Sequence, residues 1–138
     1  MTNKVTVYVP TSKDVVIKGF TNAAYQQRIT LDTEGVGQTV LRGSGENNTL
    51  VGSAHFTTPS DGGPDGLITI DVTVDYSPDG GRTWRPSDVY TDACSIQAFN
   101  LIVVVTEDQV DQDYNDAVCV ISWPGRDVET GAGDRTDG

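Results

Sequence analysis

Apolar and polar residues alternate one by one along much of this chain, and this period constrains the fold more than any other feature. The clearest case is LITIDVTVDY (67–76), in which Ile68, Ile70, Val72, Val74 and Tyr76 alternate with Thr and Asp residues. A period of two places successive side chains on opposite faces of an extended strand. The segment therefore predicts a strand with one face in a core and the other in water.

Comparable segments recur between clusters of Gly, Pro, Asp and Asn, and helix signals are nearly missing. They are KVTVYV (4–9), DVVIKGF (14–20), QRITLD (27–32), QTVLR (38–42) and TLVGSAHF (49–56). Two runs, 101–105 and 117–121, are apolar without interruption, which predicts central strands buried on both faces. We expect an all-β fold, an antiparallel β-sandwich of about nine strands with Greek-key or jelly-roll-like connections.

The length of 138 residues suits one domain, which we assign to residues 1–125. Residues 126–138 (RDVETGAGDRTDG) are polar and rich in Gly and Asp, and we expect a mobile extension. The first residues show no signal-peptide pattern, so we expect a chain that is cytoplasmic as synthesised, with any release to the cell surface or exterior by a non-Sec route.

The formal net charge of −11 limits the partners of the chain. Nucleic acid requires clustered Lys and Arg, so nucleic-acid binding is excluded, and binding to anionic membrane surfaces is disfavoured. No apolar run is long enough for membrane insertion. With Cys94, Cys119 and the single His55, the chain also lacks the ligands of a zinc site. We favour free, buried thiols over a disulfide.

One local motif, SPDGGRTW (77–84), fits the Asp-box pattern of sialidase propellers and other β proteins. In physical terms it predicts a stabilised hairpin, in which Asp79 accepts hydrogen bonds from turn amides and the glycines supply positive φ. Trp84 would then fill the base of the turn. Sialidases carry several such boxes and this chain has one, so a stabilised turn is favoured over a glycosidase.

The densest negative charge lies between the two uninterrupted apolar runs, in EDQVDQDYNDA (107–117). Five carboxylates and the amide of Asn115 within one segment form a set of oxygen donors, which suits a hard cation and Ca²⁺ in particular. An EF-hand is rejected, because Asp116 replaces the turn glycine, Ser122 replaces the bidentate Glu and no helices flank the loop. A solvated acidic hairpin tip is the alternative interpretation.

Charge counting favours two ions over one. The carboxylates of Glu107, Asp108, Asp111, Asp113 and Asp116 would overload one divalent ion and would nearly neutralise two. If Asp113 and Asp116 bridge, two adjacent calcium ions can share the loop. Glu107 and Asp111 would then lie on one side and Asn115 on the other.

The segment EDQVDQDYNDAVCVISWPG (107–125) resembles the C-terminal signature of the two-calcium, fucose- and mannose-binding bacterial lectins (lectin II type). That signature runs E-D-x-x-D-x-D-Y-N-D-A-V-x-V-I-x-W-P, and every fixed position is present. The segment VPTSKDVVIKGFTNAA (9–24) is similar to the opening strands of that family, which end in F-x-N and a short triplet that tunes sugar preference. The resemblance covers about residues 4–125, with the Asp-box hairpin as an insertion.

The resemblance implies a calcium-dependent lectin without catalysis, in which sugar hydroxyls complete the shells of two Ca²⁺ ions per chain. Its implied metal ligands are Asn22 (through its backbone carbonyl), Glu107, Asp111, Asp113, Asn115 and Asp116. Its implied sugar-binding residues are Asn22, Ala23, Ala24, Tyr25, Asp108, Asp111, Asp113, Asn115 and Asp116. The triplet Ala23–Ala24–Tyr25 lacks hydroxyl partners at its first two positions, which implies that mannose is preferred over fucose.

The family also implies a homodimer or homotetramer, in which the terminal carboxylate of one chain enters the calcium site of its partner. Here the chain continues past WPG, so Asp127, Glu129 or water would take that place. The competing hypothesis is a calcium-stabilised structural or adhesion β-sandwich that does not bind sugar. A glycoside hydrolase is disfavoured, because its two carboxylates would flank a cleft and these acids crowd one loop.

Overall fold

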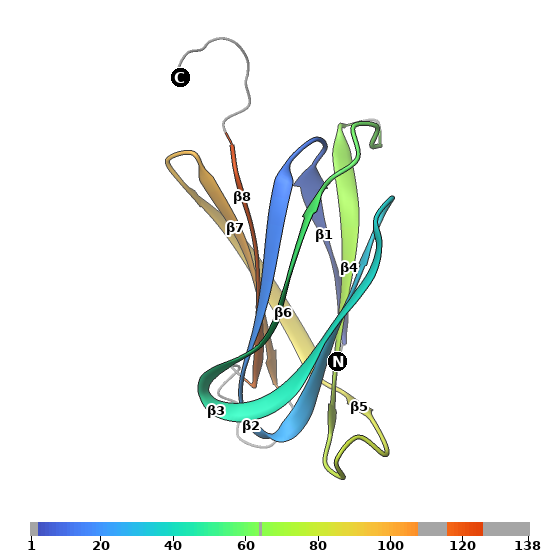
Figure 1. Ribbon diagram of the computed structural model, residues 1–138, viewed down its shortest axis with the longest axis vertical. Helices are drawn as coiled ribbons and strands as arrows, with labels where there is room; N and C mark the ends of the chain where they lie inside the picture. The colour runs from blue at the N-terminus through green and yellow to red at the C-terminus, as the bar shows by residue number, and fades with distance from the viewer. Residues whose placement is uncertain (1–2, 64, 108–115, 126–138) are drawn as a thin grey trace.

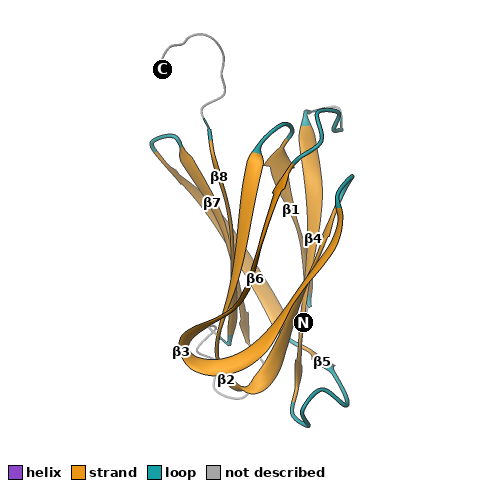
Figure 2. Cartoon of the chain, in the orientation of Figure 1, coloured by secondary structure: helices purple, strands orange, loops and turns teal. Residues whose placement is uncertain are grey.

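The computed structural model describes residues 3–63, 65–107 and 116–125, and these residues form eight strands and no helix (Figures 1 and 2). The strands are β1 (Lys4–Pro10), β2 (Asp14–Thr33), β3 (Gly37–Thr57), β4 (Leu67–Ser77), β5 (Arg85–Pro86), β6 (Asp88–Ile96), β7 (Phe99–Glu107) and β8 (Ala117–Pro124). Within these ranges no helix is available that could cross a membrane. The predicted extension, 126–138, lies outside the described residues.

All strand pairs are antiparallel, as predicted, and the main sheet runs in the order β1-β4-β2-β8-β7-β6. Strand β3 pairs with β2, and the short β5 pairs with β4. The described residues give eight strands where the sequence predicts about nine. Two pairs of neighbouring predicted strands merge, and β5 and β6 form in segments for which no strand is named above. Strand β2 joins the segments 14–20 and 27–32, and β3 joins 38–42 and 49–56, so that they reach 20 and 21 residues.

The long strand β2 changes partners half way along its length. Its first half, Val16–Thr21, pairs with β8, and its second half, Gln26–Thr33, pairs with β4. The register with β3 shifts once within the first half, between Gly19 and Phe20, and twice between the two halves. The strand thus turns a corner from one layer of the sandwich to the other, and this corner lies at the lower end of the molecule in Figure 1. Bulges are a common way to bend a strand in this manner.

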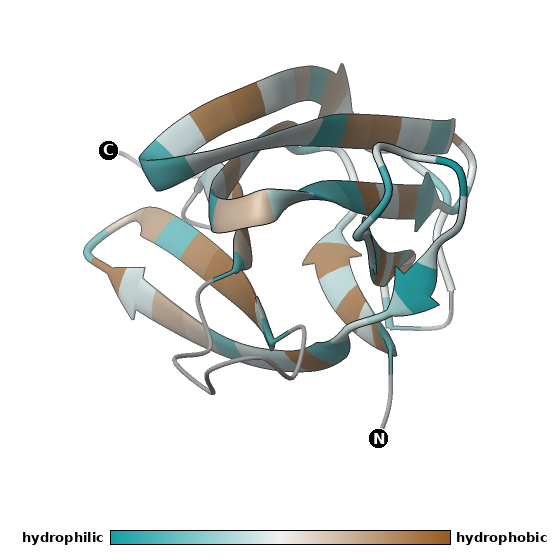
Figure 3. Cartoon of the chain, turned by 90° about the horizontal axis from the view of Figure 1, so that it is seen from below, coloured by the Kyte–Doolittle hydropathy of each residue, from teal (hydrophilic) through white to brown (hydrophobic). Residues whose placement is uncertain are grey.

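The core lies between the two layers and follows the predicted alternation. Ile68, Ile70, Val72 and Val74 of β4 are all buried, and the last three belong to one cluster with side chains of β2, β7 and β8. Figure 3 shows the strands curving around a common interior, with apolar and polar bands alternating along them.

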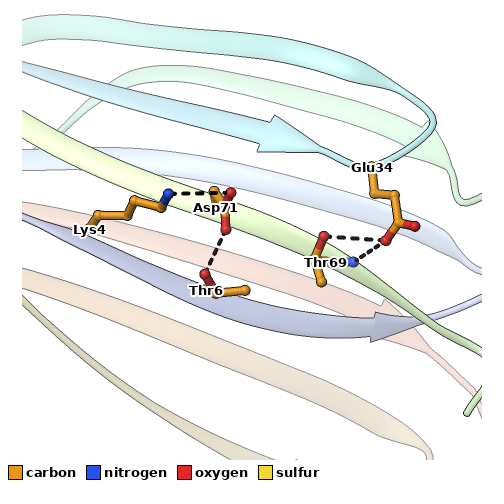
Figure 4. Close-up of polar contacts among 5 residues, drawn as sticks. All are labelled: Lys4, Thr6, Glu34, Thr69 and Asp71. Carbon is orange, nitrogen blue, oxygen red and sulfur yellow. Dashed lines mark hydrogen bonds and ion pairs between the residues drawn. The ribbon is translucent and has the colours of Figure 1, made fainter. Parts of the chain in front are cut away.

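The outer face of β1 and β4 is polar, as the Thr and Asp residues of the alternating segment predict (Figure 4). Thr6 Oγ1 donates to Asp71 Oδ1 at 2.6 Å, and Lys4 Nζ lies 3.6 Å from the same carboxylate. Near the start of β4, the backbone N–H and the hydroxyl of Thr69 both donate to Glu34 Oε1, at 3.1 and 3.3 Å. Cross-strand polar pairs of this kind suit a face in contact with water.

The outer face of β7 and β8 differs from the prediction. Ile102, Val104, Cys119 and Ile121 point into the core and are buried, with exposed fractions of 5% or less. Their outward neighbours stay half-buried in the single chain: Leu101, Val103, Val105, Val118 and Val120. The prediction that both strands are buried on both faces is therefore wrong for one chain, because these two strands have a layer on one side only.

Candidate metal centre

The corner of β2 presents a short segment that does not follow the regular ladder. Register is lost between Thr21 and Ala23 and again between Ala23 and Gln27, opposite Gly45 and Gly43 of β3. At the start of this segment, Thr21 Oγ1 donates to the carbonyl oxygen of Gly45 at 2.9 Å, which ties β2 to β3. A register break of this kind releases backbone groups from the sheet, and it is frequent beside binding sites. The predicted triplet lies within this segment.

Asn22 forms hydrogen bonds to two neighbours, with its side chain to Asn48 and with its backbone to Asp116. Its side-chain Nδ2 donates to Asn48 Oδ1 at 2.7 Å, and its Oδ1 accepts from the backbone N–H of Asn48 at 2.6 Å. Asn48 has a positive φ of 56° and lies in the part of β3 where the register with β2 shifts. The Asn22 side chain is thus engaged by β3, which agrees with a metal-binding role for its backbone carbonyl.

The backbone of Asn22 also links β2 to the start of β8. The N–H of Asn22 donates to the carbonyl oxygen of Asp116 at 3.0 Å, and the N–H of Asp116 donates to the carbonyl oxygen of Thr106 at 3.2 Å. The hydroxyl of Thr106 accepts from the N–H of Ala117 at 2.9 Å and donates to its carbonyl oxygen at 3.1 Å. These bonds bring three predicted metal ligands, Asn22, Glu107 and Asp116, to one end of the sandwich.

Glu107 and Asp116 are both almost fully buried, with exposed fractions of 2% and 3%. Burial of a carboxylate is unfavourable unless a positive charge or hydrogen bonds compensate it. Asp88 stands opposite Glu107 in the β6–β7 ladder, and its buried Oδ1 has no hydrogen-bond partner among the described residues. Acidic residues facing each other across strands repel, and a cation at this end of the sheet would remove that repulsion. The donor set therefore fits Ca²⁺.

The remaining predicted ligands and sugar contacts of the acidic segment are Asp108, Asp111, Asp113 and Asn115, which lie outside the described residues. Within the described ranges no group of three or more His, Cys, Asp or Glu residues could hold a metal ion. The structure thus places the two ends of the acidic segment and the Asn22 corner. The ligation pattern within the segment stays a prediction.

The three triplet residues have different environments. Ala23 is buried, Ala24 is exposed, and Tyr25 is 38% exposed with its ring stacked on Tyr76 of β4. The two ring centroids are 5.9 Å apart and the planes differ by 9°. The sequence did not indicate Tyr76 or Asn48 as supports of this segment, because both contacts join residues that are far apart in the chain. The Asn47–Asn48 pair is a turn signal, and both residues do adopt positive φ.

The Asp-box hairpin, 77–84, has the predicted turn structure. Asp79 Oδ1 accepts from the N–H groups of Arg82 and Thr83 at 3.1 and 2.9 Å, and Gly80 and Gly81 have φ of 78° and 98°. Hydrogen bonds from the backbone and hydroxyl of Thr83, together with that from Ser77, lower the pKa of Asp79 to about 2. Trp84 is half-buried, with the guanidinium groups of Arg28 and Arg42 at 4.1 and 5.0 Å from its ring centroid. The hairpin is therefore a turn stabilised by the hydrogen bonds of Asp79.

The family model of fucose-binding lectin II (PA-IIL) matches residues 7–125. The chain is similar to a high-affinity mannose-binding lectin of Ralstonia solanacearum, with 28% sequence identity and a TM-score of 0.67 over 88% of this chain and 96% of that chain. No curated protein sequence matches the chain.

Two further solved structures are similar in fold. The Chromobacterium violaceum lectin CV2L, solved in complex with α-methyl-fucoside, has 23% identity and a TM-score of 0.66 over 88% of this chain and 96% of that chain. The C-terminal domain of the lectin BC2L-C from Burkholderia cenocepacia has 22% identity and a TM-score of 0.63 over 91% of this chain and 100% of that domain. At these identities the likeness bears on the fold alone.

Proposed function

This chain belongs to the fucose-binding lectin II (PA-IIL) family, a family of non-enzymatic sugar-binding proteins, and from this premise we propose that it is a calcium-dependent lectin with two adjacent Ca²⁺ ions. The first ion would be held by Glu107, Asp111, Asp113 and Asp116. The second would be held by Asn22, Asp113, Asn115 and Asp116. Asp113 and Asp116 would bridge the two ions.

The ions would supply positive charge to the hydroxyl groups of a neutral sugar. Such hydroxyls gain little from ordinary hydrogen bonds in water, because solvent competes for them, whereas charge-assisted contacts are stronger. In this proposal Asp108, Asp111 and Asp116 accept hydrogen bonds from the bound hydroxyls. The protein contributes oxygen donors at fixed positions and an end of the sandwich that is partly shielded from water.

One observation of the structure supports this proposal most directly. The N–H of Asn22 and the carbonyl oxygen of Asp116 are 3.0 Å apart, so two residues proposed as ligands, from distant parts of the chain, lie next to each other. Glu107 ends β7 beside them and is buried. A solvated acidic hairpin tip would not require buried carboxylates, nor a strand from the other end of the chain against it.

We further propose that mannose is preferred over fucose. The first two triplet positions, Ala23 and Ala24, offer no hydroxyl to a sugar, and Ala23 is buried. Tyr25 is turned toward Tyr76 by their ring stack, so its ring would form one wall of the site on the β4 side. The mannose-binding lectin of Ralstonia solanacearum, at 28% identity, is a precedent for this preference.

Calorimetric titration with methyl α-mannoside and methyl α-fucoside tests the proposal. In excess calcium we expect both sugars to bind with one site per chain, and mannoside to bind more tightly. In EDTA neither sugar should bind. Asp79→Asn, in the hairpin, serves as a control that should bind like the wild type. Calcium binding without any sugar binding would instead support a structural or adhesion module, and fucoside binding more tightly would contradict the stated preference.

A further inference from the structure

The arginines of the described residues gather in one place, although the chain as a whole is acidic. The chain has nine Lys and Arg residues against 20 acids. Its described arginines are Arg28, Arg42, Arg82 and Arg85, and we call these residues together with Trp84 the arginine patch. Arg28 and Arg42 lie directly opposite each other in the β2–β3 ladder, and Arg85 begins β5, which pairs with β4. The patch is at the lower end of the molecule in Figure 1, where β5 is labelled.

The two strand arginines point outward from the sandwich. Arg28 is followed by the buried Ile29, and Arg42 is preceded by the buried Leu41. Because successive side chains of a strand alternate between its faces, both guanidinium groups lie on the outer face. The opposite end of β4 carries the polar surface of Figure 4, where the base is paired with an acid. At the arginine patch the bases outnumber the acids.

The charges of the two strand arginines are compensated unequally. Like charges directly opposite each other in a ladder repel. Asp75 of β4 compensates Arg28, since its carboxylate accepts from Arg28 Nε and Nη2 at 3.1 and 2.9 Å. Arg42 is exposed and has no acidic partner in the described ranges, where its Nε donates to the neutral Gln26 Oε1 at 3.0 Å. The two terminal nitrogens of Arg42 are therefore left for another acceptor.

The guanidinium group of Arg42 is nevertheless held in place. The ring centroid of Trp84 lies 4.1 Å from the guanidinium carbon of Arg28 and 5.0 Å from that of Arg42. Arginines stacked on an aromatic ring keep their N–H edges free to donate. The backbone of Gly81 approaches from the hairpin, and a Cβ at this position would overlap Arg42 Nη2. A donor fixed by these contacts loses little entropy when it binds an acceptor.

The arginine patch is positive in a negative surrounding. Two acids contact it, Asp75 through Arg28 and Asp79 through the backbone of Arg82, so its formal charge is +2 in a chain of net charge −11. Such a patch attracts a single anionic group, whereas a long polyanion would be repelled by the acids around it. Single-stranded nucleic acid also requires aromatic faces for base stacking, and the ring of Trp84 already faces guanidinium groups.

We propose that the arginine patch is a second ligand site, which takes the carboxylate or sulfate group of an acidic saccharide. Both groups present two oxygens to the forked nitrogens of Arg42, and the exposed Arg82 and Arg85 add positive charge. The choice of a saccharide over an acidic peptide rests on the lectin function proposed above. The two sites are also neighbours, since Gln26, which holds Arg42, directly follows Tyr25 of the triplet.

Calorimetric titration of the full chain, in calcium and saturating methyl α-mannoside, tests this proposal with the first sugar site occupied. The titrants are cellotetraose, its 6-sulfated form and its 6-carboxylated form, which separate the two sources of negative charge. We expect at least one acidic form to bind, more weakly at higher salt, and the neutral form not to bind. Hexaglutamate or an oligothymidine that binds as tightly as the acidic tetrasaccharides would overturn the choice of a saccharide.

Variants of Arg42 locate the site. Arg42→Gln should weaken binding of the acidic tetrasaccharide about tenfold, and Arg42→Lys, which keeps the charge and loses the fork, severalfold. Lys4→Gln is the matched control, because it removes a base from the far end of the same outer face, and it should bind like the wild type. Circular dichroism should be unchanged in all three.

The proposal would be overturned by a wild-type chain that binds neither acidic form, by an Arg42 variant that binds like the wild type, or by an equal loss in Lys4→Gln. The titration with methyl α-mannoside is recorded first and reports on the proposed lectin function by itself. Failure of the lectin function and failure of the arginine patch are therefore distinguishable.

Discussion

Asn22 shows how a single residue can join three parts of this fold. Its side chain is held by Asn48 of β3, and its N–H by the carbonyl oxygen of Asp116 at the start of β8. An amide that satisfies both its donor and its acceptor on one neighbour is fixed in orientation. These hydrogen bonds hold the backbone around Asn22 in place, which would lower the entropic cost of completing a metal site.

Asp113 and Asp108 are predicted to have different roles within the acidic segment. As a bridging carboxylate, Asp113 would serve both ions, so Asp113→Ala should abolish calcium binding and, with it, sugar binding. Asp108 is expected to contact sugar hydroxyls and no metal, so Asp108→Ala should keep both ions and weaken mannose binding about tenfold or more. Calcium and mannose titrations of each variant measure this, and identical behaviour of the two would refute the division of roles.

The two cysteines are free, as predicted, but only Cys119 is buried; Cys94 is exposed. Burial raises the pKa of the Cys119 thiol to about 12, so the reactive thiolate is nearly absent at neutral pH. In a Cys94→Ser variant, we expect no reaction of the folded protein with Ellman's reagent, and one thiol per chain after unfolding in guanidinium. Rapid reaction of the folded variant would show that the strand carrying Cys119 opens to solvent.

At the scale of elements, the strand segments could be predicted, because each carries its own period of two. The buried side of β4 and the turn chemistry of the hairpin both follow from local sequence. The joining of 14–20 and 27–32 into one strand could not be predicted, since the connecting residues TNAAYQ (21–26) carry no clear strand alternation. Their course depends on pairing with β8, β4 and β3, which is not encoded locally.

The same limit applies to the site. The acidic segment and Asn22 could be recognised by their donor types and by family resemblance. The contacts that position them could not, because Asn22–Asn48 and Tyr25–Tyr76 connect residues far apart in the sequence. The two-sided burial of β7 and β8 was predicted from their apolar runs, but the fold covers only one face of these strands, because the second layer packs on one side alone.

The Asp79 turn of the hairpin 77–84 is expected to contribute to stability and not to mannose binding. The pKa of Asp79 is lowered to about 2 from its ordinary value of 3.8, so its stabilising effect is fully present above about pH 4 and is lost as the pH falls through about 2. Asp79→Asn should lower the melting temperature at pH 7, and the difference from the wild type should shrink between pH 4 and pH 2. Thermal scans across this range test the pH dependence, and weaker mannose binding by the variant would argue against a purely structural turn.

For the whole molecule, the net charge of −11 makes calcium a stabilising ligand in our account. Binding to the native state alone adds about 4 kcal/mol when calcium exceeds its Kd a thousandfold. For a domain of this size we expect EDTA to lower the melting temperature by about 10 °C. Calcium added back in excess should restore it, whereas magnesium, which prefers fewer carboxylates and more water, should restore less. A melting temperature indifferent to EDTA would contradict a two-calcium site.

The number of calcium ions per chain tests the central claim most directly, namely that ions at the Asn22–Glu107–Asp116 end of the sandwich create the sugar site. Calcium is titrated calorimetrically into protein stripped of metal. Mannose binding is then measured at each calcium occupancy. Our account predicts two ions per chain and mannose binding that rises only as the second ion binds. One ion or none, or mannose binding that is complete before calcium is added, would contradict it.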